Sequence, residues 1–416
     1  MQNKKWSFTL CSMLVIVALG AFGNSANASG PHFSVIHLFT GGSNDGLIVA
    51  GGLTADKAGN LYGVTYAGGA GGHGTVYEFS PPASAGGAWS ETILHSFNGA
   101  DGDVAAGAPV MDSKGNIYGV TSRGGANNQG LVYELVHNLD GSWSENILHT
   151  FTGFGDGGQP YGLVLDSSGN VYGVAGIGGG SLTCSDCGAV FELKPAAGGW
   201  NYQLLYSFEH NANGYSPVTL VIRGGKLYGT TDFSQARNGT VFELAHQHGT
   251  WNFSLLYSFQ GGTDGVGTRT PLIFDAAGNI YGIDGSGINN LGQIFELTPS
   301  TSGQPWNKNT LYDFASKTDG YSPSSLTINK SGHLFGTTSF GGGGVACPKT
   351  SGCGEIFELV NQNGSWTKTT LYSVTGQVKE PFGATFGLNG ALFGALYGTK
   401  ANNSFGAIFK LGGVTP

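Results

Sequence analysis

Residues 32–40 read His32-Phe-Ser-Val-Ile-His-Leu-Phe-Thr40, and this short stretch decides the fold of the 416-residue chain. Its central part, Val35-Ile-His-Leu-Phe39, matches the end of a longer segment that recurs later, for example as Trp89-Ser-Glu-Thr-Ile-Leu-His-Ser-Phe97. The stretch stands before the first complete repeat, whereas the last repeat, which ends near Leu411, lacks it. A strand that is missing at one end and supplied at the other predicts a ring closed by its own N-terminus.

Two short motifs and one tryptophan mark each repeat. Gly-Asn-Leu-Tyr-Gly, first seen at Gly59–Gly63, occurs in related form seven times in all, and Gly-x-Val-Tyr-Glu-Phe, as at Gly74–Phe79, follows each copy after a glycine-rich loop. A third segment then begins with tryptophan, and every tryptophan after the first 28 residues occupies this position. These residues are Trp89, Trp143, Trp200, Trp251, Trp306 and Trp366.

Each repeat is predicted to contain four short strands, for example Ala108–Asp112, Ile117–Ser122, Leu131–Leu135 and Trp143–Phe151. These segments are rich in Val, Ile, Tyr and Thr and are bounded by Gly, Asn, Asp and Pro. Asp-x-x-Gly-Asn, as at Asp56–Asn60, predicts a tight hairpin, because Gly and Asn tolerate the positive φ of such a turn. Seven such units predict an all-β protein, a seven-bladed β-propeller of four-stranded antiparallel blades.

The seventh unit has room for only three strands of its own. We expect them near Gly383–Leu388, Ala391–Tyr397 and Gly406–Leu411. The stretch 32–40 would complete this blade and remove the exposed sheet edge, so that the propeller is closed by the N-terminal strand.

The composition also favours short strands. Glycine accounts for 75 residues, aromatic residues for 12% and charged residues for only 11% of the chain. A disordered chain carries few aromatic residues and much charge, and no glycine-free stretch has the apolar period of a long helix. We therefore expect a large folded core built from strands.

Residues 1–28 have the features of a secretory signal peptide. Two lysines precede an apolar run, Phe8–Phe22, and Ala26-Asn-Ala28 supplies the small residues that a signal peptidase recognises. The run is too short for a membrane anchor, and Cys11 lacks the preceding small residues of a lipidated cysteine. We expect cleavage after Ala28, a secreted protein in the periplasm or outside the cell, and a single propeller domain over residues 29–416.

The mature chain is acidic. Loss of Lys4 and Lys5 with the signal peptide leaves 16 basic and 26 acidic residues, so the net charge changes from −8 to −10. Nucleic acids and anionic lipids bind concentrated basic surfaces, so we expect no nucleic acid as a partner and no membrane insertion. We expect a monomer whose partner is a polysaccharide or an extracellular protein.

Four cysteines remain after cleavage, as two close pairs: Cys184 with Cys187, and Cys347 with Cys353. In an oxidising compartment each pair most simply forms a local disulfide. The alternative is zinc, because Cys-x-x-Cys is half of a four-thiolate zinc site. Only the first pair has that spacing, so we favour two disulfides and predict no metal site.

These motifs resemble those of a known family. The recurrent Leu-Tyr-Gly-Val-Thr, as at Leu61–Thr65, the Gly-Gly loop and Gly-x-Val-Tyr-Glu-Leu are similar to the GloVer tandem repeats of exported bacterial proteins. The resemblance extends from Phe33 to Leu411. It implies an exported β-rich repeat protein without established catalytic residues. Relatives often carry C-terminal anchors, whereas this chain ends five residues after its last predicted strand, which favours a released protein.

One glutamate recurs at the same position of six repeats. Glycosidases need two carboxylates about 5 to 10 Å apart, but copies on separate blades are held apart by the ring. We therefore interpret them as hydrogen-bonded residues that hold each blade together. They are Glu78, Glu134, Glu192, Glu243, Glu296 and Glu358.

His37, His95 and His149 share a position that later repeats fill with tyrosine. A position that accepts both imidazole and phenol indicates half-buried aromatic side chains near the outer edge. We expect no metal at these histidines, because ligands on separate blades would not converge on one ion.

Asp-Gly pairs follow the outermost strand of five repeats. Their carboxylates could contribute to loop-bound calcium, but no alternating run of oxygen donors surrounds them. Turn formation explains the pairs, so we predict no cofactor. The aspartates are Asp45, Asp101, Asp156, Asp264 and Asp319.

Two sets of loops are expected to share the functional face: those between the second and third strands, and those between blades. Ligand sites favour loops on a rigid scaffold, and the mouth of a propeller channel is concave. Residues that break the repeat pattern in these loops could bind a sugar, because aromatic rings stack on sugar rings and arginines pair with uronate carboxylates. The alternative for each of them is an ordinary solvated loop residue. The candidates are Tyr66, His73, Arg123, His210, Asp232, Arg237, Arg269, Asp284, Tyr397 and Lys400.

Two functions stay open. The first is a non-catalytic exported propeller that binds a glycan or a protein through its loop face. The second is a polysaccharide-active enzyme, a lyase or a glycoside hydrolase, at the channel mouth. A lyase would need a base such as Tyr66 or His73 within one sugar's width of Arg123, Arg237 or Arg269. We favour binding, with catalytic residues unassigned, because no nucleophile motif, metal triad or carboxylate pair stands out.

Overall fold

The structure is a computed structural model. It describes residues 30–84, 86–180, 184–235, 238–300, 304–343, 347, 352–375, 378–388, 390–398 and 405–414. The signal peptide predicted for residues 1–28 lies outside the described residues and stays a prediction.

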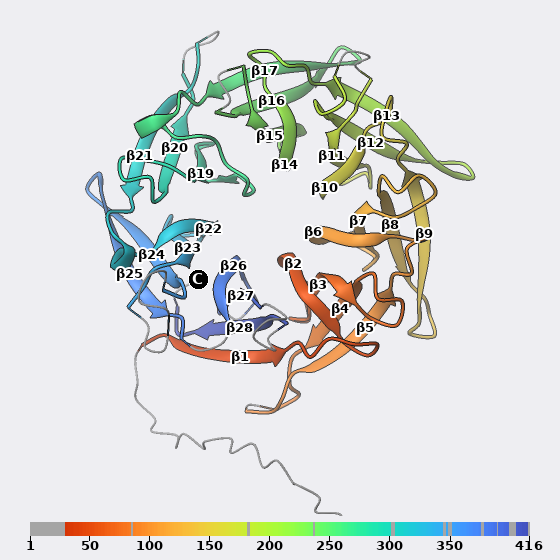
Figure 1. Cartoon of the computed structure of the whole chain (residues 1–416), viewed down its shortest axis with the longest axis horizontal. Coiled ribbons are helices and arrows are strands. Elements are labelled where there is room, and N and C mark those ends of the chain that lie inside the picture. The colour runs from red at the N-terminus through yellow and green to blue at the C-terminus, as the bar shows by residue number, and fades with distance from the viewer. Residues whose placement is uncertain are drawn as a thin grey trace, which may run out of the picture. The chain divides into compact units, whose positions relative to one another are not determined.

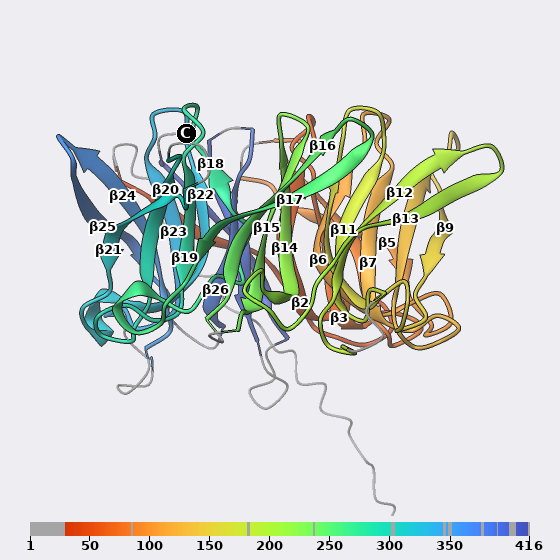
Figure 2. The same ribbon diagram turned by 90° about the horizontal axis from the view of Figure 1, so that it is seen from above.

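The described residues form seven four-stranded antiparallel sheets in a ring, which confirms the predicted seven-bladed β-propeller (Figure 1). In each blade the first strand lies beside the central channel and the last strand lies at the rim (Figure 1). Figure 2 shows the same blades from the edge of the ring.

We number the blades along the chain. Blade 1 contains β2 (Gly46–Ala55), β3 (Leu61–Gly68), β4 (Thr75–Ser80) and β5 (Ser90–Ser96). Blade 2 contains β6 (Asp103–Met111), β7 (Ile117–Arg123), β8 (Leu131–His137) and β9 (Trp143–Thr150). Blade 3 contains β10 (Gly158–Leu165), β11 (Val171–Ile177), β12 (Ala189–Ala196) and β13 (Gly199–Ser207). Blade 4 contains β14 (Tyr215–Arg223), β15 (Lys226–Phe233), β16 (Thr240–Gln247) and β17 (Thr250–Ser258).

The remaining three blades follow the same order. Blade 5 contains β18 (Ile273–Phe274), β19 (Ile280–Asp284), β20 (Gln293–Thr298) and β21 (Asn307–Asp313). Blade 6 contains β22 (Tyr321–Ile328), β23 (Leu334–Phe340), β24 (Glu355–Gln362) and β25 (Ser365–Ser373). Blade 7 contains β26 (Lys379–Phe386), β27 (Leu392–Tyr397), β28 (Ala407–Gly412) and β1 (His32–Leu38).

The helical elements of the described residues are two 3₁₀ turns, η1 (Gly262–Asp264) and η2 (Lys317–Asp319). In the described part of the chain, no helix has the length and apolar character needed to cross a membrane.

The N-terminal strand closes the ring, as the sequence predicts. β1 pairs antiparallel with β28, with His32 opposite Gly412 and Leu38 opposite Ala407 (Figure 1). A bulge between Val35 and His37 shifts the register, and just beyond the strand the Phe39 amide donates to the carbonyl of Gly406. The Phe39 ring is only 1% exposed. Without β1, the backbone groups of β28 would lack this partner strand.

The motif glycine of each repeat is explained by close packing inside the blade. A Cβ atom added at Gly63 would collide with the Tyr77 ring on the next strand, and one at Gly173 would collide with Phe191. Both rings are fully buried. The last glycine of Gly-Asn-Leu-Tyr-Gly is therefore required because the aromatic ring of the second motif lies directly on its backbone.

The predicted Asp-x-x-Gly-Asn hairpins form, but asparagine acts differently from our expectation. Gly59 has a φ of 89°, whereas Asn60 is not among the residues with positive φ. Instead, Asn60 donates its backbone N–H and its side-chain amide to the two carboxylate oxygens of Asp56, each at 2.9 Å. The aspartate thus closes the turn, and Tyr62 donates a further hydrogen bond to it.

The two innermost strands whose bounds were predicted begin earlier than expected, because each contains a strained residue that reads as a loop in the sequence. β6 begins at Asp103 rather than Ala108, and β26 begins at Lys379 rather than Gly383. Six innermost strands carry a non-glycine residue with positive φ near their start, and its N–H bonds to a loop carbonyl from the preceding blade. These residues are Ile48, Val104, Gln159, Ser216, Ser322 and Glu380.

Ring closure can be tested by removing β1. A chain that starts at Gly41 should unfold at a lower urea concentration than one that starts at Pro31. We expect a loss of at least about 3–5 kcal/mol, the range for deleting one buried phenylalanine. Urea denaturation followed by tryptophan fluorescence measures this difference. Equal midpoints for the two chains would contradict the closing role of the strand.

Candidate functional site

A cleft of about 370 Å³ opens on the predicted loop face between blades 4 and 5. The ends of β15 and β19, the connection before β18 and the start of β22 form its walls. Three of the ten predicted ligand residues line it: Asp232, Arg269 and Asp284. Its remaining lining residues are Phe233, Val266, Gly267, Thr270, Ile283, Gly285 and Pro323.

The cleft exists because the innermost strand of blade 5 is cut short. β18 has 2 residues, whereas β14 in blade 4 has 9. Residues 265–272 precede β18 without strand structure, and Val266 is exposed there. Gly-x-x-Pro begins the innermost strands of blades 4 and 6, as Gly214–Pro217 and Gly320–Pro323, whereas in blade 5 the glycine after Asp264 begins Gly265-Val-Gly-Thr-Arg-Thr-Pro271. The proline thus lies three residues further from the glycine. This break in the pattern is a sequence signal for the cleft, and the prediction from the repeats overlooked it.

Asp232 and Arg269 form an ion pair at the cleft surface. The Arg269 Nε donates to Asp232 Oδ1 at 2.8 Å, and the arginine side chain is 74% exposed. Burial raises the pKa of Asp232 above its usual value, and Arg269 only partly opposes this rise. The pair therefore presents a carboxylate acceptor and guanidinium donors to a ligand within one cleft.

Asp284 lies deeper and replaces the threonine that β3, β7 and β15 carry at this position. It is 2% exposed, its Oδ1 accepts the Ser286 N–H at 2.9 Å, and its Oδ2 has no hydrogen-bond partner. The Lys308 ammonium lies 3.8 Å from this oxygen. Burial raises the pKa of Asp284 to about 6, although Ser286 and Lys308 oppose the rise.

His73 and Arg123 lie at another point on the loop face, between blades 1 and 2. His73 Nδ1 lies 2.9 Å from Asp103 Oδ1, and Asp103 is the register partner of Arg123 in the β6–β7 pair. Asp103 is thus a site residue that sequence reasoning missed, because it follows Asp101-Gly in an ordinary turn pattern. Neither His73 nor Arg123 lines the cleft between blades 4 and 5.

Tyr66 lies near the end of β3 and Tyr397 ends β27, the second strands of the adjacent blades 1 and 7. Burial raises the pKa of Tyr66, and the nearby phenols of Tyr161 and Tyr397 add to this rise. These tyrosines are therefore close enough to influence one another electrostatically, and none of them lines the cleft. Two further candidates, Arg237 and Lys400, lie outside the described residues.

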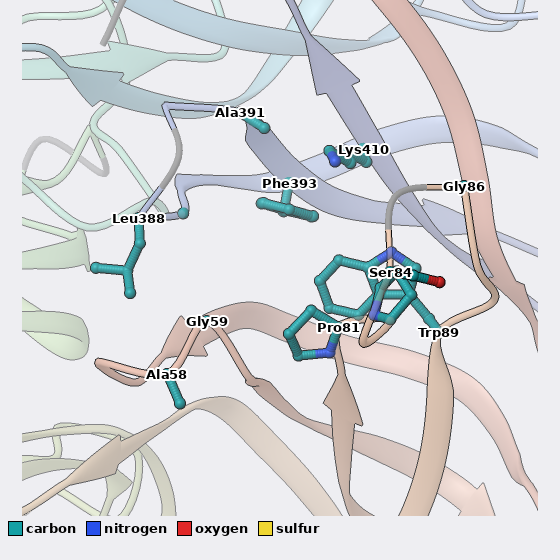
Figure 3. Close-up of a pocket in the computed structure, with 12 residues that line it drawn as sticks. Ala58, Gly59, Pro81, Ser84, Gly86, Trp89, Leu388, Ala391, Phe393 and Lys410 are labelled. Atoms are coloured by element: carbon teal, nitrogen blue, oxygen red, sulfur yellow. The ribbon is translucent and has the colours of Figure 1, made fainter.

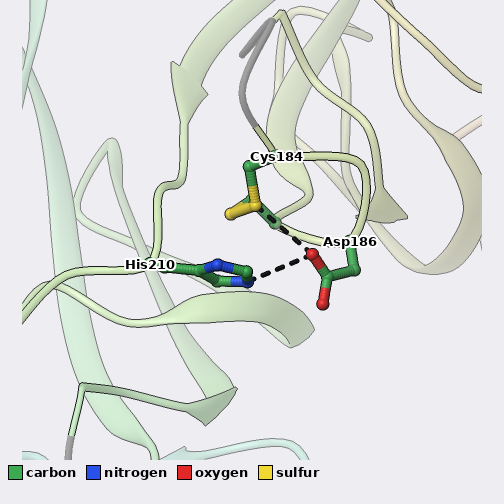
Figure 4. Close-up of side chains that lie close together, drawn as sticks. Cys184, Asp186 and His210 are labelled. Atoms are coloured by element: carbon green, nitrogen blue, oxygen red, sulfur yellow. Dashed lines mark hydrogen bonds and ion pairs between the residues drawn. A yellow bond between two sulfur atoms is a disulfide. The ribbon is translucent and has the colours of Figure 1, made fainter.

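His210 lies beside one of the cysteine pairs (Figure 4). Its Nε2 is 3.1 Å from Asp186 Oδ1, and both side chains are exposed. Cys184 and Cys187 form a disulfide, so their sulfurs are not free thiolate ligands. Cys347 and Cys353 form the second disulfide, and the Cα–Cα distance is 5.6 Å in each pair. Both predicted disulfides are confirmed.

A second pocket, of about 340 Å³, lies on the opposite face between blades 7 and 1 (Figure 3). Trp89, Phe393, Leu388 and Lys410 contribute to its lining, together with the β4–β5 turn. Phe393 and Lys410 replace the tyrosine and the glutamate that blade 2 has at these positions, where Tyr118 donates to Glu134 at 2.7 Å. None of the eight predicted ligand residues that the structure describes lines this pocket.

The recurring glutamates are hydrogen-bonded blade residues, as predicted. Asn146 also donates to Glu134, at 3.1 Å, and Tyr281 donates to Glu296 at 2.9 Å. Lys226 bonds Glu243 at 3.0 Å, and His333 bonds Glu358 at 2.8 Å. These contacts join the three outer strands of a blade or their turns and leave no paired catalytic carboxylates at this position.

The three repeat-position histidines are half-buried at the rim, as predicted, but the reason we gave against metal binding is wrong. The Asp-Gly loop and the last strand of the next blade bring carboxylates to the same histidine. His37 faces Asp45 and Glu91, and His95 faces Asp101 and Glu145. Side chains from adjacent blades therefore do converge, because the rim strands lie side by side.

The raised pKa of Asp284 predicts a pH-dependent stability. The folded pKa of about 6 exceeds the usual 3.8, so this group stabilises the fold at low pH and loses that contribution as pH rises from 4 to 6. Between pH 4 and pH 7 the wild type should lose about 1–3 kcal/mol relative to Asp284→Asn. Urea unfolding of both proteins at each pH measures this difference. Parallel pH profiles would contradict the assigned pKa.

Several solved structures share the fold at low sequence identity. The extracellular domains of two proteins described as hybrid two-component systems from B. thetaiotaomicron align with TM-scores of 0.56 and 0.53, each at 12% identity. The alignments cover 94% and 91% of this chain and 43% and 41% of those chains. A protein described as a 6-phosphogluconolactonase from Bacteroides uniformis has a TM-score of 0.48 at 14% identity, over 86% of this chain and 94% of that one.

At 12% identity, the likeness to the two extracellular domains shows the fold alone. No curated protein matches the sequence. The Gloeobacter/Verrucomicrobia repeat, however, matches two tandem regions, residues 24–236 and 219–414. Because these regions span nearly all seven blades, the chain belongs to the Gloeobacter/Verrucomicrobia repeat family.

Proposed function

We propose that this protein is an exported binding protein that holds a glycan in the cleft between blades 4 and 5. The observation that carries the proposal is the Asp232–Arg269 pair, whose arginine is exposed beside apolar walls. Sugar hydroxyls both donate and accept hydrogen bonds, so they can pair with the carboxylate and the guanidinium together. The apolar side chains Phe233 and Val266, both exposed, suit the C–H faces of a sugar ring.

The geometry favours a glycan over a protein partner. A cleft of about 370 Å³ lies in the size range of small-ligand pockets, which is about 300–1,000 Å³. Protein partners instead need an interface of about 800 Å² per partner. Asp232 beside Arg269 also disfavours a dense polyanion, so a neutral or sparsely acidic sugar fits better than a highly charged one.

Export is the location that best fits the chain. The predicted signal peptide would direct secretion, and the two disulfides are stable in an oxidising compartment. We therefore place the binding event in the periplasm or outside the cell.

One observation supports the enzymatic alternative in the same cleft. Asp284 has a pKa of about 6 and a buried oxygen without a hydrogen-bond partner, as a general acid would. Asp232 supplies a second carboxylate, so a glycoside hydrolase is the enzyme class that this cleft suits. The lyase arrangement has less support, because Tyr66 and His73 do not line the cleft that contains Arg269.

The binding proposal predicts a specific effect of Arg269. Arg269→Ala should weaken retention on the bound polysaccharide about tenfold or more, because a hydrogen bond to a charged group contributes roughly 1.5–3 kcal/mol. The experiment screens the purified protein against immobilised neutral and acidic polysaccharides and measures dissociation constants for the ligand that is retained. Its matched control is Lys330→Ala, which removes one exposed positive charge in the β22–β23 turn on the opposite face.

The same assay separates the two functions. Retention without new reducing ends supports the binding protein, whereas reducing ends that disappear in Asp284→Asn would establish the hydrolase. Equal retention of wild type and Arg269→Ala would refute the cleft as the binding site.

A further inference from the structure

Two neighbouring blade junctions contain the same cluster of three side chains. At the junction of blades 7 and 1, His37 of β1 meets Asp45 of the connecting loop and Glu91 of β5. At the junction of blades 1 and 2, the cluster recurs as His95, Asp101 and Glu145. We call these two groups the His–Asp–Glu clusters.

The side chains in each cluster face one another without hydrogen bonds between them. His37 Nε2 lies 3.5 Å from Asp45 Oδ1 and 3.4 Å from Glu91 Oε2. His95 Nε2 lies 3.5 Å from Asp101 Oδ2 and 3.6 Å from Glu145 Oε2. Both Nε2 atoms are buried and have no hydrogen-bond partner, and the same holds for one oxygen each of Glu91 and Glu145. Buried polar atoms without partners are uncommon and indicate a missing ligand or function.

The rim strands of blades 5 and 6 show that a pair of carboxylates at a junction is accompanied by a cation. The position of Glu91 and Glu145 on the rim strand is occupied by Lys308 in blade 5 and by Lys368 in blade 6. Each lysine side chain is only 5% exposed, and its ammonium lies between two carboxylates. Lys308 meets Asp264 and Asp284, and Lys368 meets Asp319 and Glu355. At those junctions the protein supplies its own cation for the two acids.

We propose that each His–Asp–Glu cluster binds a divalent transition-metal ion, for which zinc is the best fit. Imidazole nitrogens and carboxylate oxygens are both zinc ligands, and two carboxylates balance the charge of the ion. Ligands at about 2.1 Å from a tetrahedral ion are about 3.4 Å apart, which is close to the His–Asp and His–Glu separations in both clusters. The fourth position is left for water.

Groups around the ligands hold them in place. Asp45 Oδ2 accepts the Thr40 N–H at 2.6 Å and the Thr40 hydroxyl at 2.7 Å, whereas Oδ1 accepts the Gly46 N–H at 2.6 Å and faces His37. In the second cluster, Asp101 accepts the Asn98 N–H at 2.8 Å. Such outer contacts orient metal ligands in known sites. Because His37 lies on the closing strand, a metal there would also tie β1 to blade 1.

The junction of blades 2 and 3 provides an internal contrast. Tyr202 replaces the glutamate, and His149 Nε2 bonds Asp156 Oδ2 directly at 3.0 Å. The Tyr202 ring stacks on His149 with a centroid distance of 4.2 Å. With one carboxylate and a satisfied histidine, this junction needs no ion, so we expect two metal sites and not three.

The proposal is tested by counting zinc. Tag-free protein is stripped with a chelator, dialysed against zinc chloride and analysed by inductively coupled plasma mass spectrometry. We expect two zinc ions per chain and an increase in Tm on zinc addition, since a ligand that binds the folded state stabilises it. Glu91→Gln and Glu145→Gln should each retain one zinc, and the double variant none. Glu78→Gln, the same exchange at a hydrogen-bonded position of blade 1, should retain two.

Each other outcome decides against the proposal. Less than one zinc per wild-type chain, two zinc ions in the double variant, or binding of calcium but not zinc would overturn it. If a glutamine variant does not fold, the wild-type count still applies, and His37→Asn and His95→Asn provide a second pair of single-site variants. The visible spectrum of the cobalt-loaded wild type adds an independent readout, because a tetrahedral site is strongly coloured and an octahedral one is not.

Discussion

The pairing of β1 with β28 is the interaction on which the rest of the structure depends. It joins residues 369 to 380 positions apart in sequence, and it converts a row of six complete blades and one incomplete blade into a closed ring. Every other sheet is built from consecutive strands, so each blade forms from local contacts. Closure then brings the rim of blade 7 against blade 1, where Phe39 and Phe79 pack together at 6.1 Å. The junctions between blades are therefore as important to this molecule as the blades themselves.

Charge is handled differently from one junction to the next, although the backbone geometry repeats. Where the rim strand carries lysine, two acids surround its ammonium, and where it carries tyrosine, a single aspartate bonds the neighbouring histidine. Where it carries glutamate, burial raises the pKa of Glu91 to about 7 and that of Glu145 to about 8. The residue at this rim position thus determines how many carboxylates meet at a junction and what faces them. A lysine neutralises two acids, a tyrosine leaves a single aspartate bonded to histidine, and a glutamate adds a second acid without a lysine to neutralise it.

The repeat pattern was sufficient to predict the fold, because glycine and aromatic motifs report contacts within one blade. Gly63 and Tyr77 are separated by one loop, so their packing is visible as a spacing. Junction contacts leave no such signal. Asp232 and Arg269 are 37 residues apart and on different blades, and His73 meets Asp103 across a similar gap. Pattern breaks identified several of these residues, but could not show that Asp232, Arg269 and Asp284 share one cleft while Tyr66 and His73 lie elsewhere.

The innermost strand of blade 5 shows why asymmetry matters in a repeat protein. In six blades, a residue with positive φ ties the start of this strand to the preceding blade, at the cost of backbone strain. In blade 5 the proline lies three residues further from the glycine of its Asp-Gly pair than in blade 6, and the strand shrinks to two residues. The segment before this short strand brings Arg269 to Asp232, and the cleft that it lines includes Asp284, which stands where four of the other six blades have a buried threonine. A local change in one strained segment thus accompanies the conversion of one of seven equivalent junctions into a polar cleft, without disturbing the closed ring that supports it.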